Sequence, residues 1–319
     1  MLQSKARWKI KQVDEARVEA LSRELNLSKI ATRFLVQRGI VEAETARQFI
    51  SNSNSVVHDP FLMKDRDKAV ERIKLAIEKG ERFLILGDYD ADGVTSTSLL
   101  YLLLKKMGAI VAFYVPNRFT EGYGPNEEAF RQAKEEGVSL IITVDTGISA
   151  VHEANVAKGL GMDLIITDHH EVPPEIPNAY AVINPKQEDC PYPNKNLAGV
   201  GVAFKLAHAL LGRFPEEYVD LVSIGTIADL VPLLDENRYL AAEGLKKIRQ
   251  NERIGIKALL EECSVSAHEV NEEHIGFAVG PRLNAAGRLD SADPAIYLLI
   301  TEDEMEAREL AVLLDDLNS

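Results

Sequence analysis

Apolar residues recur every three or four positions through much of the first 80 residues of the chain. That spacing places them along one face of a helix, so it predicts amphipathic helices near the N-terminus. Gly39 and Gly80 follow two of these segments and mark their ends, because glycine favours the backbone conformation found just past a helix. The predicted helices are residues 13–25, 27–38 and 65–79.

From residue 83 onward, short apolar runs of strand length alternate with stretches of helical periodicity. Strands separated by helices are typical of a parallel sheet covered by helices on both faces. We therefore predict an α/β fold, with a parallel sheet flanked by helices. The predicted strands are residues 83–87, 110–115, 140–144 and 164–167, and the predicted helices are residues 95–107, 126–136 and 150–158.

Beyond residue 196 the pattern is mostly helical. Helices are predicted at residues 198–211, 216–228, 238–250 and 303–317. We expect three parts: a helical N-terminal region (1–80), an α/β domain (81–235) and a helical segment (236–319). The last predicted helix reaches the end of the sequence without a cap or a breaker, so we expect it to be a linker helix within a longer protein.

Three of the predicted strands run directly into acidic residues. These are Asp88, Asp90 and Asp92 after the first strand, Asp145 after the third, and Asp168, with His169 and His170, after the fourth. One such aspartate is more often a turn residue or a helix cap. Three clusters at the carboxyl ends of parallel strands meet at one edge of the sheet, where ligands gather. Packed carboxylates need cations, and carboxylates with an imidazole suit Mn²⁺ or Mg²⁺.

The composition is that of a globular protein, but the net charge disfavours one class of partner. Apolar residues make up 46% of the chain and charged residues 27%, as in globular proteins, and no apolar run approaches a membrane span. The net charge of −14 argues against a nucleic-acid partner. However, residues 1–82 carry 17 Lys and Arg against 12 Asp and Glu, and bound cations would offset a carboxylate cluster. Binding of a single nucleic-acid strand is therefore expected to be weak, and its affinity is expected to depend only slightly on salt concentration.

Other classes of protein are disfavoured by missing patterns. The basic N-terminus lacks the apolar stretch of a signal peptide, and Cys190 and Cys263 are widely separated, which predicts reduced cysteines in a cytoplasmic protein. No G-x-G-x-x-G opens a helix after a strand. Gly199 and Gly201 lack the rest of that pattern and predict helix packing instead.

Six segments together resemble the DHH superfamily of phosphoesterases, and most closely its RecJ-type exonuclease branch. The likeness runs in order from about residue 83 to residue 317, and the joint occurrence is specific, although each segment alone is weak. The segments are residues 86–96 (LGDYDADGVTS), 117–118 (NR) with 121–124 (EGYG), 143–147 (TVDTG), 168–170 (DHH), 225–233 (GTIADLVPL) and 280–289 (GPRLNAAGRL).

The resemblance implies a centre that holds two ions, Mn²⁺ or Mg²⁺. Asp90 and Asp92 would each favour one ion, with Asp145 between them. The second ion would also be held by His169 and Asp229.

Other residues have auxiliary roles under the same resemblance. Some relatives place a histidine where this chain has Leu86, and Asp88 would substitute for it in part at the first ion. Asp168 would orient a histidine and would not itself bind an ion.

The resemblance also assigns residues to the phosphodiester substrate. His170 would contact the scissile phosphate or donate a proton, and Arg118 would clamp a phosphate oxygen. Arg282, Asn284 and Arg288 would hold the incoming strand. The alternative for these last three is a helix-packing turn whose arginines cap carboxyl ends. Tyr123 either stacks on a base or packs a turn, and the sequence does not decide between them.

The implied activity is metal-dependent hydrolysis of single-stranded DNA from the 5′ end, in DNA repair and recombination, with other repair proteins as potential partners. A first alternative is a DHH-type phosphodiesterase that acts on short oligonucleotides or cyclic dinucleotides, since it would share the same metal residues. The helical N-terminal region and the span from residue 225 to 289 favour the first activity. A second alternative, a scaffold without catalysis, is disfavoured by the intact acidic residues.

Overall fold

The computed structural model describes residues 9–52, 56–289 and 291–319, and the chain divides into two compact units, Met1–Val56 and Val57–Ser319. The first unit contains α1 (Glu15–Leu25), α2 (Lys29–Gln37) and α3 (Ala43–Ser51). Asp14 and Ser28 cap the first two helices by accepting hydrogen bonds from backbone N–H groups of the first turn. Two helices predicted in this region are thus confirmed; residues 1–8 and 53–55 of the predicted N-terminal region lie outside the described residues.

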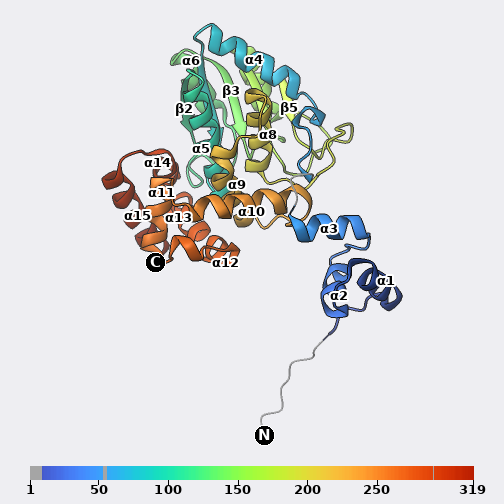
Figure 1. The fold of residues 1–319 in the computed structure, drawn as a ribbon. Coiled ribbons are helices and arrows are strands. Elements are labelled where there is room, and N and C mark those ends of the chain that lie inside the picture. The colour runs from blue at the N-terminus through green and yellow to red at the C-terminus, as the bar shows by residue number, and fades with distance from the viewer. Residues whose placement is uncertain (1–8, 53–55, 290) are drawn as a thin grey trace. The chain divides into compact units, whose positions relative to one another are not determined.

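The second unit is built on a parallel sheet with strand order β2-β1-β3-β4-β5 (Figure 1). Its strands are β1 (Arg82–Gly87), β2 (Ile110–Tyr114), β3 (Val138–Val144), β4 (Asp163–Thr167) and β5 (Ala181–Ile183). Gly87 pairs with Val144, and Val144 pairs with Thr167, so three central strands end level with one another. This register brings the residues that follow them to one edge of the sheet. The predicted parallel sheet is confirmed; β5 was not predicted, because its three residues are too few to show a period.

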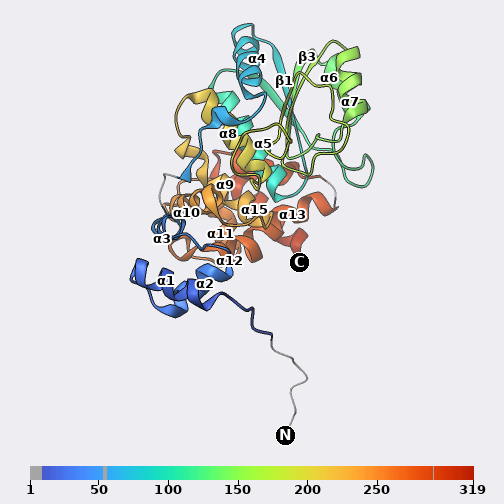
Figure 2. The same cartoon turned by 90° about the vertical axis from the view of Figure 1, so that its right-hand side faces the viewer.

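Alternating side chains of the strands enter two separate cores. Ile85 and Ile142 belong to the core that also contains residues of α4 (Arg66–Glu78), α5 (Ala91–Lys106) and α8 (Gly199–Leu211). Leu84 and Ile141 belong to the other core, with α6 (Glu127–Glu135) and α7 (Val151–Gly159). Figure 2 shows the sheet between these two groups of helices. The strands are therefore buried on both faces, as their nearly continuous apolar sequences predict.

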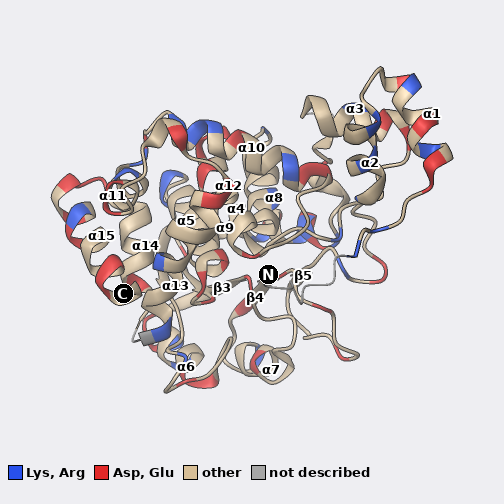
Figure 3. Ribbon diagram, turned by 90° about the horizontal axis from the view of Figure 1, so that it is seen from below, with Lys and Arg blue, Asp and Glu red and all other residues tan. Residues whose placement is uncertain are grey.

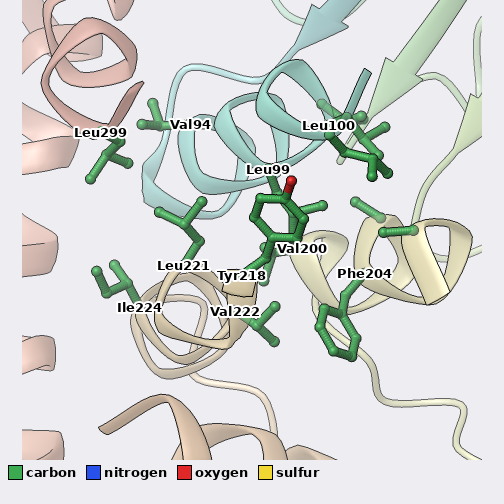
Figure 4. Packing of buried hydrophobic residues seen from close by; sticks show 14 of the residues in the cluster. Val94, Leu99, Leu100, Val200, Phe204, Tyr218, Leu221, Val222, Ile224 and Leu299 are labelled. Carbon is green, nitrogen blue, oxygen red and sulfur yellow. The ribbon is translucent and has the colours of Figure 1, made fainter. Parts of the chain in front are cut away.

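Helices beyond residue 218 extend the first core. Leu221, Val222 and Ile224 of α9 (Val219–Ala228) pack among Leu99 of α5 and Val200 of α8 (Figure 4). The remaining helices are α10 (Asp235–Arg249), α11 (Ile254–Glu262), α12 (Glu272–His274), η5 (Ile275–Val279), α13 (Gly280–Leu289), α14 (Asp293–Ile300) and α15 (Glu304–Asn318), and short 3-10 turns lie at η2 (Pro60–Leu62), η3 (Glu216–Tyr218) and η4 (Ala267–Glu269).

The sequence predicted α9, α10 and α15 but not α11, α13 or α14. Glycine or proline interrupts the helical pattern in each of them, at Gly255 in α11, at Pro281 and Gly287 in α13, and at Pro294 in α14. Among the described residues, no helix combines the length and the apolar composition that a membrane span requires. The division predicted at residues 80/81 and 235/236 stays a prediction.

The first turn of α10 anchors a fully buried ion pair. Glu236 and Lys205 each expose 0% of their surface, and Lys205 Nζ lies 2.7 Å from Glu236 Oε2. The hydroxyl of buried Tyr192 donates to the other carboxylate oxygen at 2.5 Å, and Lys205 Nζ also donates to His58 O at 2.8 Å. Since both charges are desolvated, each depends on the other for compensation.

We predict that Lys205→Met lowers the free energy of unfolding by about 3–5 kcal/mol, because it leaves the carboxylate of Glu236 buried without a cation. The matched control is Lys246→Met, which removes an exposed lysine paired with Glu243 at 2.6 Å and should change stability by less than about 1 kcal/mol. Urea denaturation of both variants measures the difference. Equal effects of the two substitutions would contradict this account.

Candidate metal centre

The acidic residues predicted from the strand ends meet at the carboxyl edge of the sheet. Asp88 directly follows β1, and Asp90 is the N-cap of α5, where its Oδ1 accepts hydrogen bonds from the backbone N–H groups of Asp92 and Gly93 at 3.0 Å. Figure 3 shows acidic residues beside the ends of β3 and β4. An aspartate at this position satisfies two free N–H groups of the helix and also keeps one carboxylate oxygen available.

Asp92 is held by a second helix, which lies far away in the sequence. The N–H groups of Gly199 and Val200, in the first turn of α8, donate to its two carboxylate oxygens at 2.6 and 2.8 Å. Helix N-termini favour negative charge, so α8 supports the ionised form of this buried side chain. A Cβ on Gly199 would collide with Asp145 Oδ1, so glycine is required for this close approach.

Asp145 follows β3 with a left-handed backbone, φ 59°, and exposes only 1% of its surface. A non-glycine residue in this conformation is strained, and such strain concentrates at functional sites. Its Oδ1 lies 3.1 Å from Nε2 of His169, which follows β4. The two strand ends therefore bring a carboxylate oxygen and an imidazole nitrogen face to face.

The protonation of His169 is fixed by the backbone. Its Nδ1 lies 3.0 Å from the carbonyl oxygen of Leu197, so Nδ1 carries the hydrogen and donates it. Nε2 is therefore the lone-pair nitrogen, and it faces Asp145 Oδ1 at 3.1 Å and Asp92 Oδ2 at 3.8 Å. Burial lowers the pKa of His169, which favours this neutral form.

Two lone-pair atoms 3.1 Å apart repel each other unless a proton or a cation lies between them. Among the described residues, buried Asp145 Oδ1 has no hydrogen-bond donor. A divalent cation fits this requirement, because carboxylates and a neutral imidazole are its usual ligands. Sets of ligand atoms within 4.8 Å of one another are Asp88, Asp90 and Asp145; Asp92, His169 and Asp229; and Asp145, His169 and His170.

Burial and crowding raise the pKa values of four of these carboxyl groups. Burial, followed by the charge of Asp90, raises the pKa of Asp88 and of Asp92 to about 7. Burial and the charge of Asp92 raise the pKa of Asp229 to about 7 and that of Asp145 well above its ordinary value. Cations would remove this penalty by favouring the ionised forms.

Asp168 differs from these carboxyl groups because it is surrounded by donors. Its Oδ1 accepts from the N–H groups of His169 and His170 and from Nδ1 of His170, at 2.7 to 3.1 Å, and its Oδ2 accepts from Ile148 N at 2.8 Å. Although burial acts to raise it, the pKa of Asp168 is held below its ordinary value by the hydrogen bond and charge of His170. The same hydrogen bond raises the pKa of His170, whose side chain is 46% exposed.

The loop after β2 lies beside these residues. Arg118 is exposed, with its guanidinium carbon 5.3 Å from the ring centre of Tyr89. Tyr123 meets Tyr89 and His170 edge to face, with ring centres 6.3 and 6.2 Å apart. An exposed guanidinium and aromatic rings beside the acidic cluster are available to a ligand, and the phosphate role of Arg118 stays a prediction.

Two of the three residues expected to hold a DNA strand make contacts within the protein. Arg282 binds Asp315 of α15 through Nε at 2.7 Å and Nη2 at 2.6 Å, and Nη1 donates to Ala278 O. Asn284 Oδ1 accepts from Ala91 N at 2.7 Å and so caps α5. These contacts correspond to the packing alternative, whereas Arg288 is exposed. The strand-holding role of all three stays a prediction.

Sequence reasoning missed the backbone groups of the site. The Leu197 carbonyl fixes His169, and the Gly199 and Val200 N–H groups fix Asp92. Gly199 was expected to serve helix packing alone. No side-chain type marks a backbone donor or acceptor, so the only signal was a glycine at the start of a predicted helix.

Comparison with known proteins agrees with this geometry. Residues 82–226 match the family described as DHH family, N-terminal domain. The chain is 56% identical over 318 residues to the single-stranded-DNA-specific exonuclease RecJ of Bacillus subtilis (strain 168), a match that covers 100% of this chain and 40% of that protein.

Solved structures of RecJ from Thermus thermophilus are also similar. The complex with Mn²⁺ has a TM-score of 0.81 and 31% identity, covering 95% of this chain and 44% of that one. The complex with Mg²⁺ has a TM-score of 0.71 and 30% identity, covering 95% and 41%. The chain therefore spans less than half the length of each of these relatives.

The crowded carboxyl groups generate a prediction about pH. A carboxyl group whose pKa is raised on folding contributes stability that is present below its unfolded pKa of about 4 and is lost as pH rises through its folded pKa. Asp145→Asn does not ionise, so in EDTA it should be more stable than the wild type, by a margin that widens from about pH 5 to about pH 8.

Thermal melts across this pH range measure that margin. Added Mn²⁺ at about pH 8 should raise the Tm of the wild type and raise that of Asp145→Asn much less. A margin independent of pH would show that Asp145 carries no such penalty.

Replacement of His169 and replacement of His170 should have different effects on metal binding and on catalysis. His169→Ala should weaken binding of one Mn²⁺ by at least about tenfold, because Nε2 faces Asp145 and Asp92. His170→Ala should bind Mn²⁺ almost normally and lose catalytic rate, because Asp168 holds Nδ1 and the role expected for the free Nε2 is to contact a phosphate or donate a proton. Calorimetric titration with Mn²⁺ tests this, and equal losses of affinity would mean that the two roles are wrongly assigned.

Proposed function

The chain belongs to the DHH family, and on that premise we propose that it is a metal-dependent phosphodiesterase that degrades single-stranded DNA from the 5′ end. The observation that carries the proposal is the approach of Asp145 Oδ1 to the lone pair of His169 Nε2 at 3.1 Å, inside a cluster of carboxyl groups with raised pKa values. Such an arrangement is costly without cations and suited to holding them.

The residues divide into two groups of ligands for Mn²⁺ or Mg²⁺. Asp88, Asp90 and Asp145 would hold one ion, and Asp92, His169 and Asp229 the other, with Asp145 facing both groups. When bound, a pair of such ions lowers the pKa of a water molecule and stabilises the negative charge of a leaving oxygen.

The chain's own residues would orient the phosphodiester and move protons. His170 is held by Asp168 through Nδ1, which leaves Nε2 available to contact a phosphate or to donate a proton. Its raised pKa favours the protonated form required for either role. Arg118 would bind a phosphate oxygen, since its guanidinium is exposed beside Tyr89.

The choice of single-stranded DNA rests on the relatives. RecJ of Bacillus subtilis is named as a single-stranded-DNA-specific exonuclease, and its likeness extends over the full length of this chain. A role in DNA repair and recombination, and a cytoplasmic location suited to the free Cys190 and Cys263, belong to the same proposal. The alternative is hydrolysis of short oligonucleotides or cyclic dinucleotides by the same metal residues.

We predict that the chain releases mononucleotides from a 5′-labelled single strand when Mn²⁺ or Mg²⁺ is present, and that EDTA stops the reaction. A 3′-labelled strand should lose its label only at the end of degradation, which reports the polarity. The matched control is Asp145→Asn, which should reduce the rate by several orders of magnitude in a folded protein. Faster turnover of a dinucleotide than of a long strand would favour the alternative substrate.

A further inference from the structure

One buried amide side chain in the first turn of α10 ties two distant segments together. Asn237 exposes 1% of its surface. Its Nδ2 donates to Asn196 O at 2.6 Å and to Pro232 O at 3.1 Å, and its Oδ1 accepts from Asn194 Nδ2 at 3.1 Å. Every polar atom of this side chain is therefore engaged, and the two donor contacts reach different stretches of the chain.

Each of these stretches leads to a proposed ligand of the same ion. Asn196 directly precedes Leu197, whose carbonyl oxygen accepts the hydrogen of His169 Nδ1 at 3.0 Å. Pro232 lies three residues after Asp229. The Asn237 amide therefore contacts both the segment next to Leu197, whose carbonyl orients His169, and the loop that carries Asp229.

The loop that carries Asp229 has an unfavourable backbone conformation at both ends. Leu230 has φ 61° and Asp235 has φ 51°, so two non-glycine residues in the left-handed region bracket the loop. The Leu230 side chain is 85% exposed, so burial does not fix the turn next to Asp229, although Val231 and Leu233 further along the loop pack against the core. Because left-handed backbone is unfavourable for residues with a Cβ, the loop keeps this shape only where other contacts fix it.

We propose that Asn237 is a positioning residue for the ion held by Asp92, His169 and Asp229. Asn237 itself binds no ion; it holds Leu197 and the Asp229 loop at the separation that the ligands need. This inference rests on the proposed metal centre and deepens it, by assigning a residue that supports one ion only.

Replacement of Asn237 should affect only one ion, because different contacts hold the ligands of the other ion. The loop with Asp88 and Asp90 leads into α5, which is capped by Asn284 through Ala91 N at 2.7 Å. A Cβ on Gly287 would collide with Tyr89, so α13 packs directly on this loop. Neither contact involves Asn237, and the ion held by Asp88, Asp90 and Asp145 should be insensitive to its replacement.

The test is Asn237→Asp at an alkaline pH at which the new carboxyl group is ionised; it keeps the shape and the acceptor but replaces the donor Nδ2 by an oxygen. Titration of the metal-free chain with Mn²⁺, followed by electron paramagnetic resonance and calorimetry, should show one site weakened by about 10- to 100-fold and the other unchanged. The added negative charge by itself would strengthen cation binding, so weaker binding identifies lost positioning and not altered charge.

The matched control is Ser223→Ala, which removes a buried hydrogen bond from Ser223 Oγ to Ala241 O (3.0 Å). This bond also secures α10, but it touches neither segment, so both Mn²⁺ affinities should remain. If Asn237→Asp does not fold by circular dichroism, Asn194→Ala decides the question. It removes the partner of Asn237 Oδ1 and should weaken the same site to a smaller degree.

The outcomes separate this inference from the proposed function. A wild-type chain that binds no Mn²⁺ would overturn both. A wild-type chain that binds two ions, together with a folded Asn237→Asp that binds both with unchanged affinity, would overturn the positioning role alone. Weakening of both sites by the same factor would also overturn it, because the two segments that Asn237 contacts lead to His169 and Asp229 and not to Asp88 or Asp90.

Discussion

Repulsion among carboxyl groups at one edge of a parallel sheet is the constraint on which the rest of this structure depends. Level strand ends force Asp88, Asp145 and Asp168 to follow three neighbouring strands at the same edge. Burial there removes the water that would otherwise screen them, so the pKa of Asp145 is raised well above its ordinary value. The surrounding helices and loops supply donors to Asp92 and Asp168 and leave Asp145 Oδ1 without a donor, at the position proposed for a cation.

The donors come mainly from backbone groups and not from basic side chains. Asp92 is bound by two N–H groups of α8, and Asp168 by three N–H groups of nearby loops together with the ring of His170. A lysine or arginine beside Asp92 or Asp145 would compete with a cation for the carboxylate. Backbone N–H groups hold the oxygens in place with partial charge only, so they orient ligands without neutralising them.

The segment 280–289 packs against the loop that contains Asp88 and Asp90. Asn284 caps the helix that begins with the metal-site loop, and Gly287 allows α13 to approach Tyr89. Arg282 fastens α13 to α15 through Asp315. These contacts give Arg282, Asn284 and Gly287 a packing role, while the strand-holding role of Arg282, Asn284 and Arg288 stays a prediction.

The sequence by itself determined the parallel α/β fold and the positions of the aspartates and histidines, because strand periods and the residues that follow a strand are local features. It did not determine short elements such as β5, whose three residues show no period. Only the tertiary structure decided which groups contact the proposed metal ligands and the motif residues: Asp92 meets Gly199 across 107 residues, and Arg282 meets Asp315 across 33. Contacts at such separations depend on how whole helices pack, and a backbone N–H or carbonyl is the same in every non-proline residue, so no local pattern marks them.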